Sequence, residues 1–151
     1  MYSKKIYNNI IDILKEFGCQ GDASQGTITL KGQQVKTNIP LSASVSFVIF
    51  VFEDSYSILT VLDDFRITDK LSTSDFIMRT NLNLRKEVLI LDFDRSSFMS
   101  MTRVDCRDTE LSTTEFYGNM LRIMNLFGEL YDKLLKVNMG ILSPQAASDS
   151  L

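Results

Sequence analysis

Phe47-Val48-Ile49-Phe50-Val51-Phe52 contains no polar side chain, and this stretch decides the class of fold. β-branched and aromatic residues favour strands, and successive side chains of a strand point to opposite faces of its sheet. A run that is apolar at every position therefore needs cover on both faces. Val88-Leu89-Ile90-Leu91 repeats the pattern later in the chain. The sequence predicts a sheet whose two faces are both apolar.

The sequence around these two runs indicates strands joined by hairpins. Residues 44–53 and 56–63 are predicted strands, separated only by the Asp54-Ser55 link. Residues 87–93 and 98–107 form a second predicted pair across a short polar turn. Hairpin connections predict a sheet that is mainly antiparallel.

The region before the first hairpin is weaker in strand character. Between residues 27 and 39, short strand-like stretches are broken at Gly32 and end at Pro40, which cannot donate to a ladder. These stretches predict one or two short peripheral strands.

Three helices are predicted from spacing and capping residues. The first covers residues 4–17 and ends at Gly18, and the second begins near Ser72 and runs to about residue 84. The third, long helix begins at a capping box from Ser112 to Glu115 and ends before Gly140. Apolar residues at helical spacing support the first helix: Ile6, Ile10, Ile13, Leu14 and Phe17.

Together these elements predict an α+β fold with the order α-β-β-β-α-β-β(-β)-α. We expect a mainly antiparallel sheet of five to six strands with three helices. Residues 1–142 are expected to form a single domain, and the small polar residues 143–151 a flexible C-terminal tail.

Charge and hydropathy limit the partners and the location. The net charge of −3 offers no general positive field for a nucleic-acid backbone, so no nucleic-acid partner is expected. The longest strongly apolar run has six residues, far fewer than the ~20 of a membrane-spanning helix. The N-terminus lacks the apolar core of a signal peptide, and two cysteines make no disulfide framework. We expect a cytoplasmic protein without membrane contact.

The chain has no histidine, which removes the usual proton-transfer side chain and the commonest nitrogen ligand of zinc. Asp92 and Asp94 lie on one face of a predicted strand and are the best acid–base candidates. Because they flank a turn, we favour a structural role for them, and the same holds for Asp63 and Asp64.

The remaining chemistry is also weak. Cys19 and Cys106 have no histidine to generate a thiolate, so a structural role is favoured for both. The glycines match neither a P-loop nor a dinucleotide fingerprint. The sequence predicts no enzyme, no catalytic residue, no metal and no cofactor.

A binding surface is predicted on the strands. The 47–52 run exposes either its odd-numbered or its even-numbered residues, and the cover could be a helix of this chain, an identical subunit or a bound polypeptide. Met99 and Met101 share one strand face, where flexible thioethers suit adaptable contacts, although core filling is their commoner role. The predicted partner- or dimer-binding residues are Val48, Phe50, Phe52, Met99 and Met101.

Three short stretches carry a family resemblance. They are Asn81-Leu82-Asn83, Leu91-Asp92-Phe93-Asp94, and the run from Phe127 to Val137 that leads to Gly140. In this order they resemble the YbjN-like members of the type III secretion chaperone-like fold. Ser96-Ser97 departs from the pattern, because relatives often place a glycine-containing turn there. The resemblance implies homodimers that hold protein segments, or proposed regulators of sensory transduction, and it brings no catalytic residues.

The sequence therefore predicts a non-enzymatic, chaperone-like or regulatory protein-binding module. It would act as a homodimer that holds a segment of an unidentified partner protein. The alternative is a regulator that binds a small ligand between the sheet and the long helix. A third hypothesis is an enzyme that uses Asp92, Asp94 or Cys106.

Overall fold

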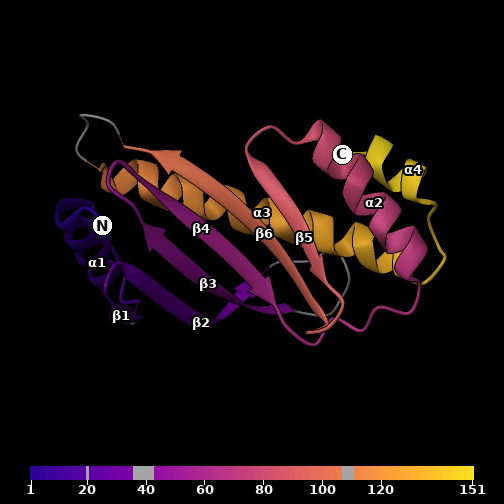
Figure 1. Ribbon diagram of the computed structural model, residues 1–151, viewed down its shortest axis with the longest axis horizontal. Coiled ribbons are helices and arrows are strands. Elements are labelled where there is room, and N and C mark those ends of the chain that lie inside the picture. The colour runs from indigo at the N-terminus through magenta and orange to yellow at the C-terminus, as the bar shows by residue number, and fades with distance from the viewer. Residues whose placement is uncertain (20, 36–42, 107–110) are drawn as a thin grey trace.

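The computed structural model describes residues 1–19, 21–35, 43–106 and 111–151. Two features expected from the sequence lie outside these residues: the end of the strand-like stretches at Pro40 and the end of a strand at Arg107. The described chain has the element order α1-β1-β2-β3-β4-α2-β5-β6-α3-α4 (Figure 1).

One antiparallel sheet of six strands runs through the molecule in the order β1-β2-β3-β4-β6-β5. This arrangement confirms the α+β class and the antiparallel sheet. The strands are β1 (Asp22–Ser24), β2 (Thr27–Val35), β3 (Ala43–Val51), β4 (Ser55–Leu62), β5 (Glu87–Asp92) and β6 (Ser97–Asp105).

The first hairpin adds a fourth strand before the middle helix, where the sequence predicted three. Gln25 and Gly26 both adopt left-handed backbone angles, with φ of 47° and 84°. Two consecutive left-handed residues form the tight turn that matches the twist of paired strands. Gly32, with φ of 72°, lies at the irregularity between Leu30 and Gln33 that interrupts β2 pairing.

The described residues also form four helices: α1 (Lys4–Glu16), α2 (Lys70–Asn83), α3 (Thr113–Asn138) and α4 (Pro144–Asp149). The Ser112 side chain accepts a hydrogen bond from the Glu115 amide, as the predicted capping box requires. Helix α2 begins two residues before Ser72, because the Asp69 carboxylate caps the helix by accepting from the Ser72 amide at 3.0 Å.

Residues 143–151, for which the sequence predicted a flexible tail, contain the helix α4. Ser143 caps α4 by accepting from the Ala146 amide at 3.1 Å, and Ala147 is fully buried. The Lys133 ammonium also donates to the Ser150 hydroxyl at 2.9 Å. Small residues made this segment look like a tail, but their size lets α4 pack closely against α2 and α3.

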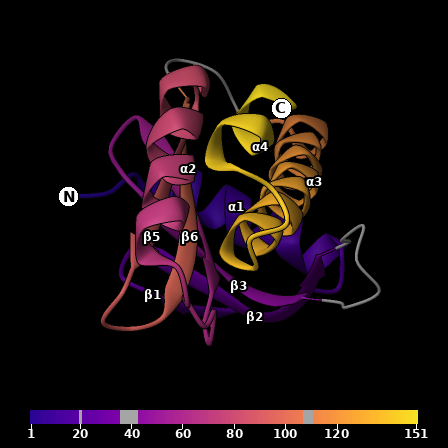
Figure 2. The same cartoon turned by 90° about the vertical axis from the view of Figure 1, so that its right-hand side faces the viewer.

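The core lies between one face of the sheet and the helices. Figure 2 shows α1, α3 and α4 on the same side of β2 and β3. Phe47, Ile49 and Val51 of β3 point to this side and are buried. From the helix layer, the Phe127 ring of α3 stacks on the Phe98 ring of β6, with ring centroids 4.8 Å apart.

Candidate binding surface

The opposite face of the sheet carries eight apolar side chains on four neighbouring strands. We call these residues the outer sheet face: Val48 and Phe50, Leu59 and Val61, Val88 and Ile90, and Met99 and Met101. In Figure 1 the strands lie in front of α3, so this face points toward the viewer.

The register of the sheet brings these side chains into rows. Val48 pairs with Leu59, Leu59 with Met101, and Met101 with Val88. Side chains directly opposite in neighbouring strands contact one another, so this row forms a continuous apolar strip across four strands. A parallel row contains Val61, Met99 and Ile90.

The outer sheet face is open to solvent. Val88 and Ile90 are 55% and 36% exposed, and the six other members are half-buried by their neighbours. No helix of the described residues lies over this face (Figures 1 and 2). A contiguous apolar patch of this kind marks an interaction surface more often than single exposed apolar residues do.

The structure thereby decides which alternate set of the 47–52 run points outward: it is the even-numbered one. Val48 and Phe50 lie on the same face as Met99 and Met101. Phe52 follows the end of β3, is 45% exposed, and its ring centroid lies 5.9 Å from the Arg103 guanidinium. All five residues predicted to bind a partner are therefore gathered on or beside the outer sheet face.

A second exposed apolar surface was missed by the sequence prediction. Leu71, Met78 and Leu82 of α2 are 85%, 66% and 85% exposed. Their separations of seven and four residues put them on one stripe of the helix, opposite the buried Phe76 and Thr80. The spacing itself can be read in the sequence. Because α2 carries apolar residues on both its buried and its exposed side, the sequence does not show which apolar stripe is exposed.

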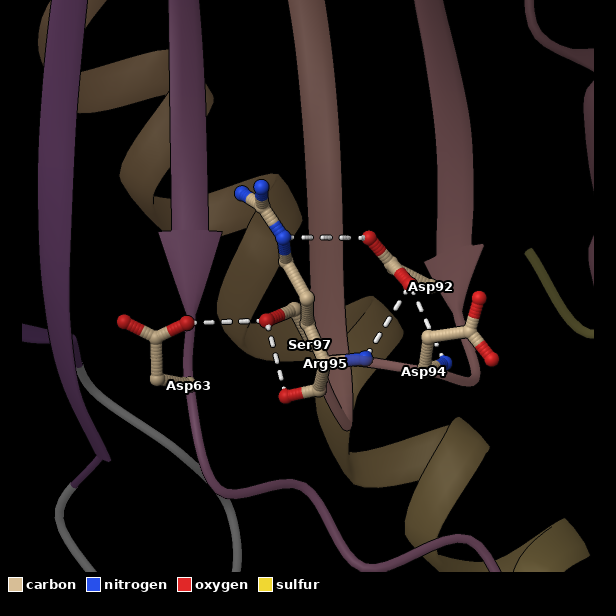
Figure 3. A network of polar contacts seen from close by, with 5 residues as sticks. All are labelled: Asp63, Asp92, Asp94, Arg95 and Ser97. Carbon is tan, nitrogen blue, oxygen red and sulfur yellow. Dashed lines mark hydrogen bonds and ion pairs between the residues drawn. The ribbon is translucent and has the colours of Figure 1, made fainter.

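The acidic catalytic candidates have structural roles in turns. Asp92 accepts hydrogen bonds from the backbone amides of Asp94 and Arg95, both at 3.1 Å, while the Asp94 carboxylate is exposed (Figure 3). Asp63 accepts from the Ser97 hydroxyl at 2.8 Å (Figure 3). The carboxylates thus stabilise the β5–β6 turn and do not meet as an acid–base pair.

Two residues of the turns adopt left-handed conformations. Ser96 has φ of 51°, and Asp64 has φ of 61°. The Ser96 carbonyl also accepts from the Phe65 amide at 2.8 Å, which holds the turn in this conformation. Ser96 therefore adopts a backbone conformation in this turn that glycine takes more readily.

The cysteines do not form a reactive site. Cys106 is buried, and desolvation, with the nearby Asp105 charge, raises the pKa of its thiol. A raised pKa keeps sulfur in the thiol form, which is the poor nucleophile. Cys19 is half-buried between α1 and the β1–β2 hairpin.

Neither a metal cluster nor a membrane helix is found in the part of the chain that the structure describes. Three or more acidic, cysteine or histidine side chains do not gather in metal-binding geometry among these residues. No described helix combines the length and apolar character needed to cross a membrane.

An apolar pocket of about 320 Å³ lies at the other end of the sheet. It is formed by α1 with β1 and β2, whereas the ligand pocket expected from the sequence lies between the sheet and the long helix. Its lining comprises Ile11, Leu14, Lys15, Cys19, Gly21, Ala23 and Ile28.

Comparisons with known proteins identify the fold. No protein-family model and no curated protein sequence matches this chain. The crystal structure of YbjN, a proposed transcription regulator from E. coli, matches with a TM-score of 0.60 and 10% sequence identity. The match covers 95% of this chain and 98% of YbjN. The chain therefore has a YbjN-like α+β fold.

Proposed function

We propose that this chain is a non-enzymatic protein-binding module of the cytoplasm, chaperone-like or regulatory in its role. It acts as a homodimer that holds a segment of a partner protein. The observation that carries this proposal is the outer sheet face, an apolar surface on four strands with all helices placed on the other side or at the edge.

The face of the sheet supports binding better than its edges do. At one edge, Asn81 of α2 donates to the Leu89 carbonyl at 3.0 Å and accepts from the Leu89 amide at 2.8 Å, so part of the free edge of β5 is already bonded. At the other edge, β1 is only three residues long. Short or covered edges limit the addition of a further strand.

The acidic residues and cysteines support a non-enzymatic role. Asp63 and Asp92 are occupied in turn hydrogen bonds, and Cys106 is a buried thiol of raised pKa. The outer sheet face offers instead side chains whose burial is favourable by roughly 25 cal/mol per Å² of apolar surface. Stable contacts between proteins bury about 800 Å² on each partner.

The decisive experiment places a charge in the centre of the outer sheet face. Met101→Asp introduces a carboxylate at a half-buried position that a partner would cover, and the added desolvation of this charge would cost several kcal/mol. Leu82→Asp makes the same kind of change on the exposed stripe of α2 and serves as the matched control. Light scattering measures the oligomeric state, and co-purification from the native cell measures partner retention.

The two measurements separate the occupants of the surface. A wild-type dimer that becomes monomeric with Met101→Asp, but not with Leu82→Asp, means that a second copy covers the outer sheet face. Loss of a co-purified partner with the dimer intact means that the partner covers it. A monomeric wild type whose bound proteins are the same with and without Met101→Asp contradicts the proposal.

A second candidate function is a regulator that binds a small ligand in the pocket between α1 and the β1–β2 hairpin. The volume of about 320 Å³ falls in the range of small-molecule sites, and Ile11, Leu14 and Ile28 give it apolar walls. A thermal-shift screen with metabolites tests it. A ligand that raises the Tm of the wild type but not of Ala23→Leu, which narrows the pocket, would support this function.

A further inference from the structure

A cleft of about 520 Å³ lies where the ladder between β5 and β6 ends. Most of its lining side chains are basic or polar: Arg85, Lys86, Arg103, Val104, Asp105, Asn119 and Arg122. They come from the connection between α2 and β5, from the end of β6 and from α3. Nothing in the sequence places these residues together.

The cleft exists because β6 is longer than its neighbour. Pairing between β5 and β6 stops at Glu87 and Thr102, while β6 remains paired with β4 as far as Asp105. Arg85 and Lys86 approach this end of β6 without forming a strand. Within the described residues, the end of β6 therefore has a strand neighbour on one side only.

The unpaired side of β6 presents main-chain groups to the cleft. The Cys106 amide donates to the Asp54 carbonyl at 2.8 Å, on the β4 side. Main-chain groups point alternately to the two neighbours of an antiparallel strand. The N–H and C=O groups of Arg103 and Asp105 consequently point away from β4, to the side where β5 no longer pairs with β6. A short extended segment could hydrogen bond there as an added strand.

The charge of the cleft is opposite to that of the whole chain. Among the residues that the structure describes, four cationic side chains and one carboxylate line the cleft, in a protein of net charge −3. Arg85 and Lys86 form no ion pair with another described residue. Arg103 reaches Asp54 and Asp105 only at 3.8 Å and 3.6 Å. These cations are available to an anionic ligand.

Arg122 is fixed in place by a buried partner. It pairs with Glu87, whose side chain is 7% exposed, while the Arg122 side chain keeps 40% of its surface exposed. A guanidinium has five N–H donors, so one ion pair leaves donors for a further carboxylate. Glu87 thus orients Arg122 at the floor of the cleft.

Arg103 joins the cleft to the outer sheet face. Phe50 of β3 pairs with Ser57 of β4, and Ser57 pairs with Arg103 of β6, so the three residues form one cross-strand row. The Arg103 guanidinium also lies over the Phe52 ring. We propose that the cleft binds clustered carboxylates of an acidic protein segment whose apolar part lies on the outer sheet face. This inference rests on the proposed function and names the chemistry of the partner.

A polypeptide fits the cleft better than a nucleic acid does. Among the lining residues that the structure describes, Val104 is the only apolar side chain, and none has an aromatic ring on which a base could stack. Nucleic-acid binding gains its affinity from many phosphate contacts along a basic track, whereas these cations are confined to one cleft of an acidic chain. The main-chain groups of β6 are complementary to a peptide backbone.

Fluorescence anisotropy with two labelled peptides tests the inference on the full chain. The probes are Val-Glu-Val-Glu-Val-Glu-Val and the same peptide with glutamine at each glutamate position. Arg85→Gln combined with Lys86→Gln removes two exposed, unpaired cations. Lys31→Gln combined with Arg66→Gln removes the same two charges from exposed positions elsewhere and is the matched control.

We expect the glutamate peptide to bind about tenfold more weakly to the Arg85/Lys86 variant and less than twofold more weakly to the control. We also expect the glutamine peptide to bind more weakly than the glutamate peptide. Equal losses in both variants, or equal affinity for both peptides, would overturn the inference. So would a short DNA duplex or triphosphate that binds the cleft while the glutamate peptide does not.

Failure of this inference is distinguishable from failure of the proposed function. Met101→Asp changes the outer sheet face without removing a cation of the cleft. Insensitivity of the partner to Met101→Asp contradicts the binding role of the face. Insensitivity of the glutamate peptide to the Arg85/Lys86 variant contradicts the cleft alone.

Discussion

At the scale of single residues, Asn138 holds the last turn of α3 to the segment that precedes α2. Its side-chain oxygen accepts from the backbone amides of Thr68 and Asp69 at 2.9 Å and 3.1 Å. Its side-chain nitrogen donates to the Arg66 carbonyl at 2.9 Å. One buried amide thus satisfies three backbone groups in a segment without regular structure.

Asn138→Ala should lower the free energy of unfolding by about 2 kcal/mol, because it removes three part-buried hydrogen bonds to the backbone at once. Urea unfolding followed by circular dichroism measures the change. Asn125→Ala, at an exposed position of the same helix, is the control and should change stability by less than about 0.5 kcal/mol. Equal effects of both substitutions would contradict the role given to Asn138.

Tyr56 makes stability depend on alkaline pH. Burial raises the pKa of its phenol from 10.0 to about 12, and the neighbouring Asn119 amide opposes this rise only in part. No described group lies within hydrogen-bonding geometry of the Tyr56 hydroxyl. Between pH 10 and 12 the unfolded chain loses this proton first, so the folded state loses stability as the pH rises through this window.

The expected loss from Tyr56 over this window is roughly 2 kcal/mol, since one pKa unit corresponds to ~1.4 kcal/mol. Urea unfolding at the two ends of the window should show a steeper loss for the wild type than for Tyr56→Phe. Tyr117→Phe removes an exposed phenol and should keep the wild-type slope. Parallel slopes for the wild type and Tyr56→Phe would show that Tyr56 titrates normally.

At the scale of secondary-structure elements, α2 protects the edge of the sheet. The Asn81 amide forms two hydrogen bonds with the main chain of Leu89, as a neighbouring strand would. Outward-facing N–H and C=O groups of an edge strand otherwise pair readily with other chains. The helix therefore acts both as a core element and as a cover for β5.

Asn81→Ala should cost about 1–2 kcal/mol of unfolding free energy and increase aggregation, because the Leu89 main-chain groups lose their partner. Chemical unfolding and light scattering at increasing protein concentration measure the two effects. Asn83→Ala, at the exposed last residue of the helix, is the matched control. The role of Asn81 is wrong if its variant scatters and unfolds like the control.

At the scale of the whole molecule, charge and apolar surface are distributed unevenly. The chain is acidic overall, yet four described cations, Arg103 among them, line the cleft. The cleft adjoins the outer sheet face, since Arg103 lies in the same cross-strand row as Phe50 of that face. A partner segment with an apolar and an acidic part would satisfy both surfaces at once.

Much of the fold follows from local signals in the sequence. The apolar runs of β3 and β5, the hairpin links and the Ser112 capping box depend on neighbouring residues, so they predict the antiparallel sheet and α3 correctly. The α4 helix was missed because its small residues have weak local preferences, and its burial comes from contacts with α2 and α3.

The sequence by itself determined the α+β class, the double-faced strands and the lack of histidine chemistry, because these depend on residue type and spacing. Only the tertiary structure decided that Val48 and Phe50 point outward, since side-chain alternation is symmetric until helices cover one face. The tertiary structure alone brought Arg85, Arg103 and Arg122 together. They lie in separate segments of the chain and meet where β6 extends beyond the end of β5.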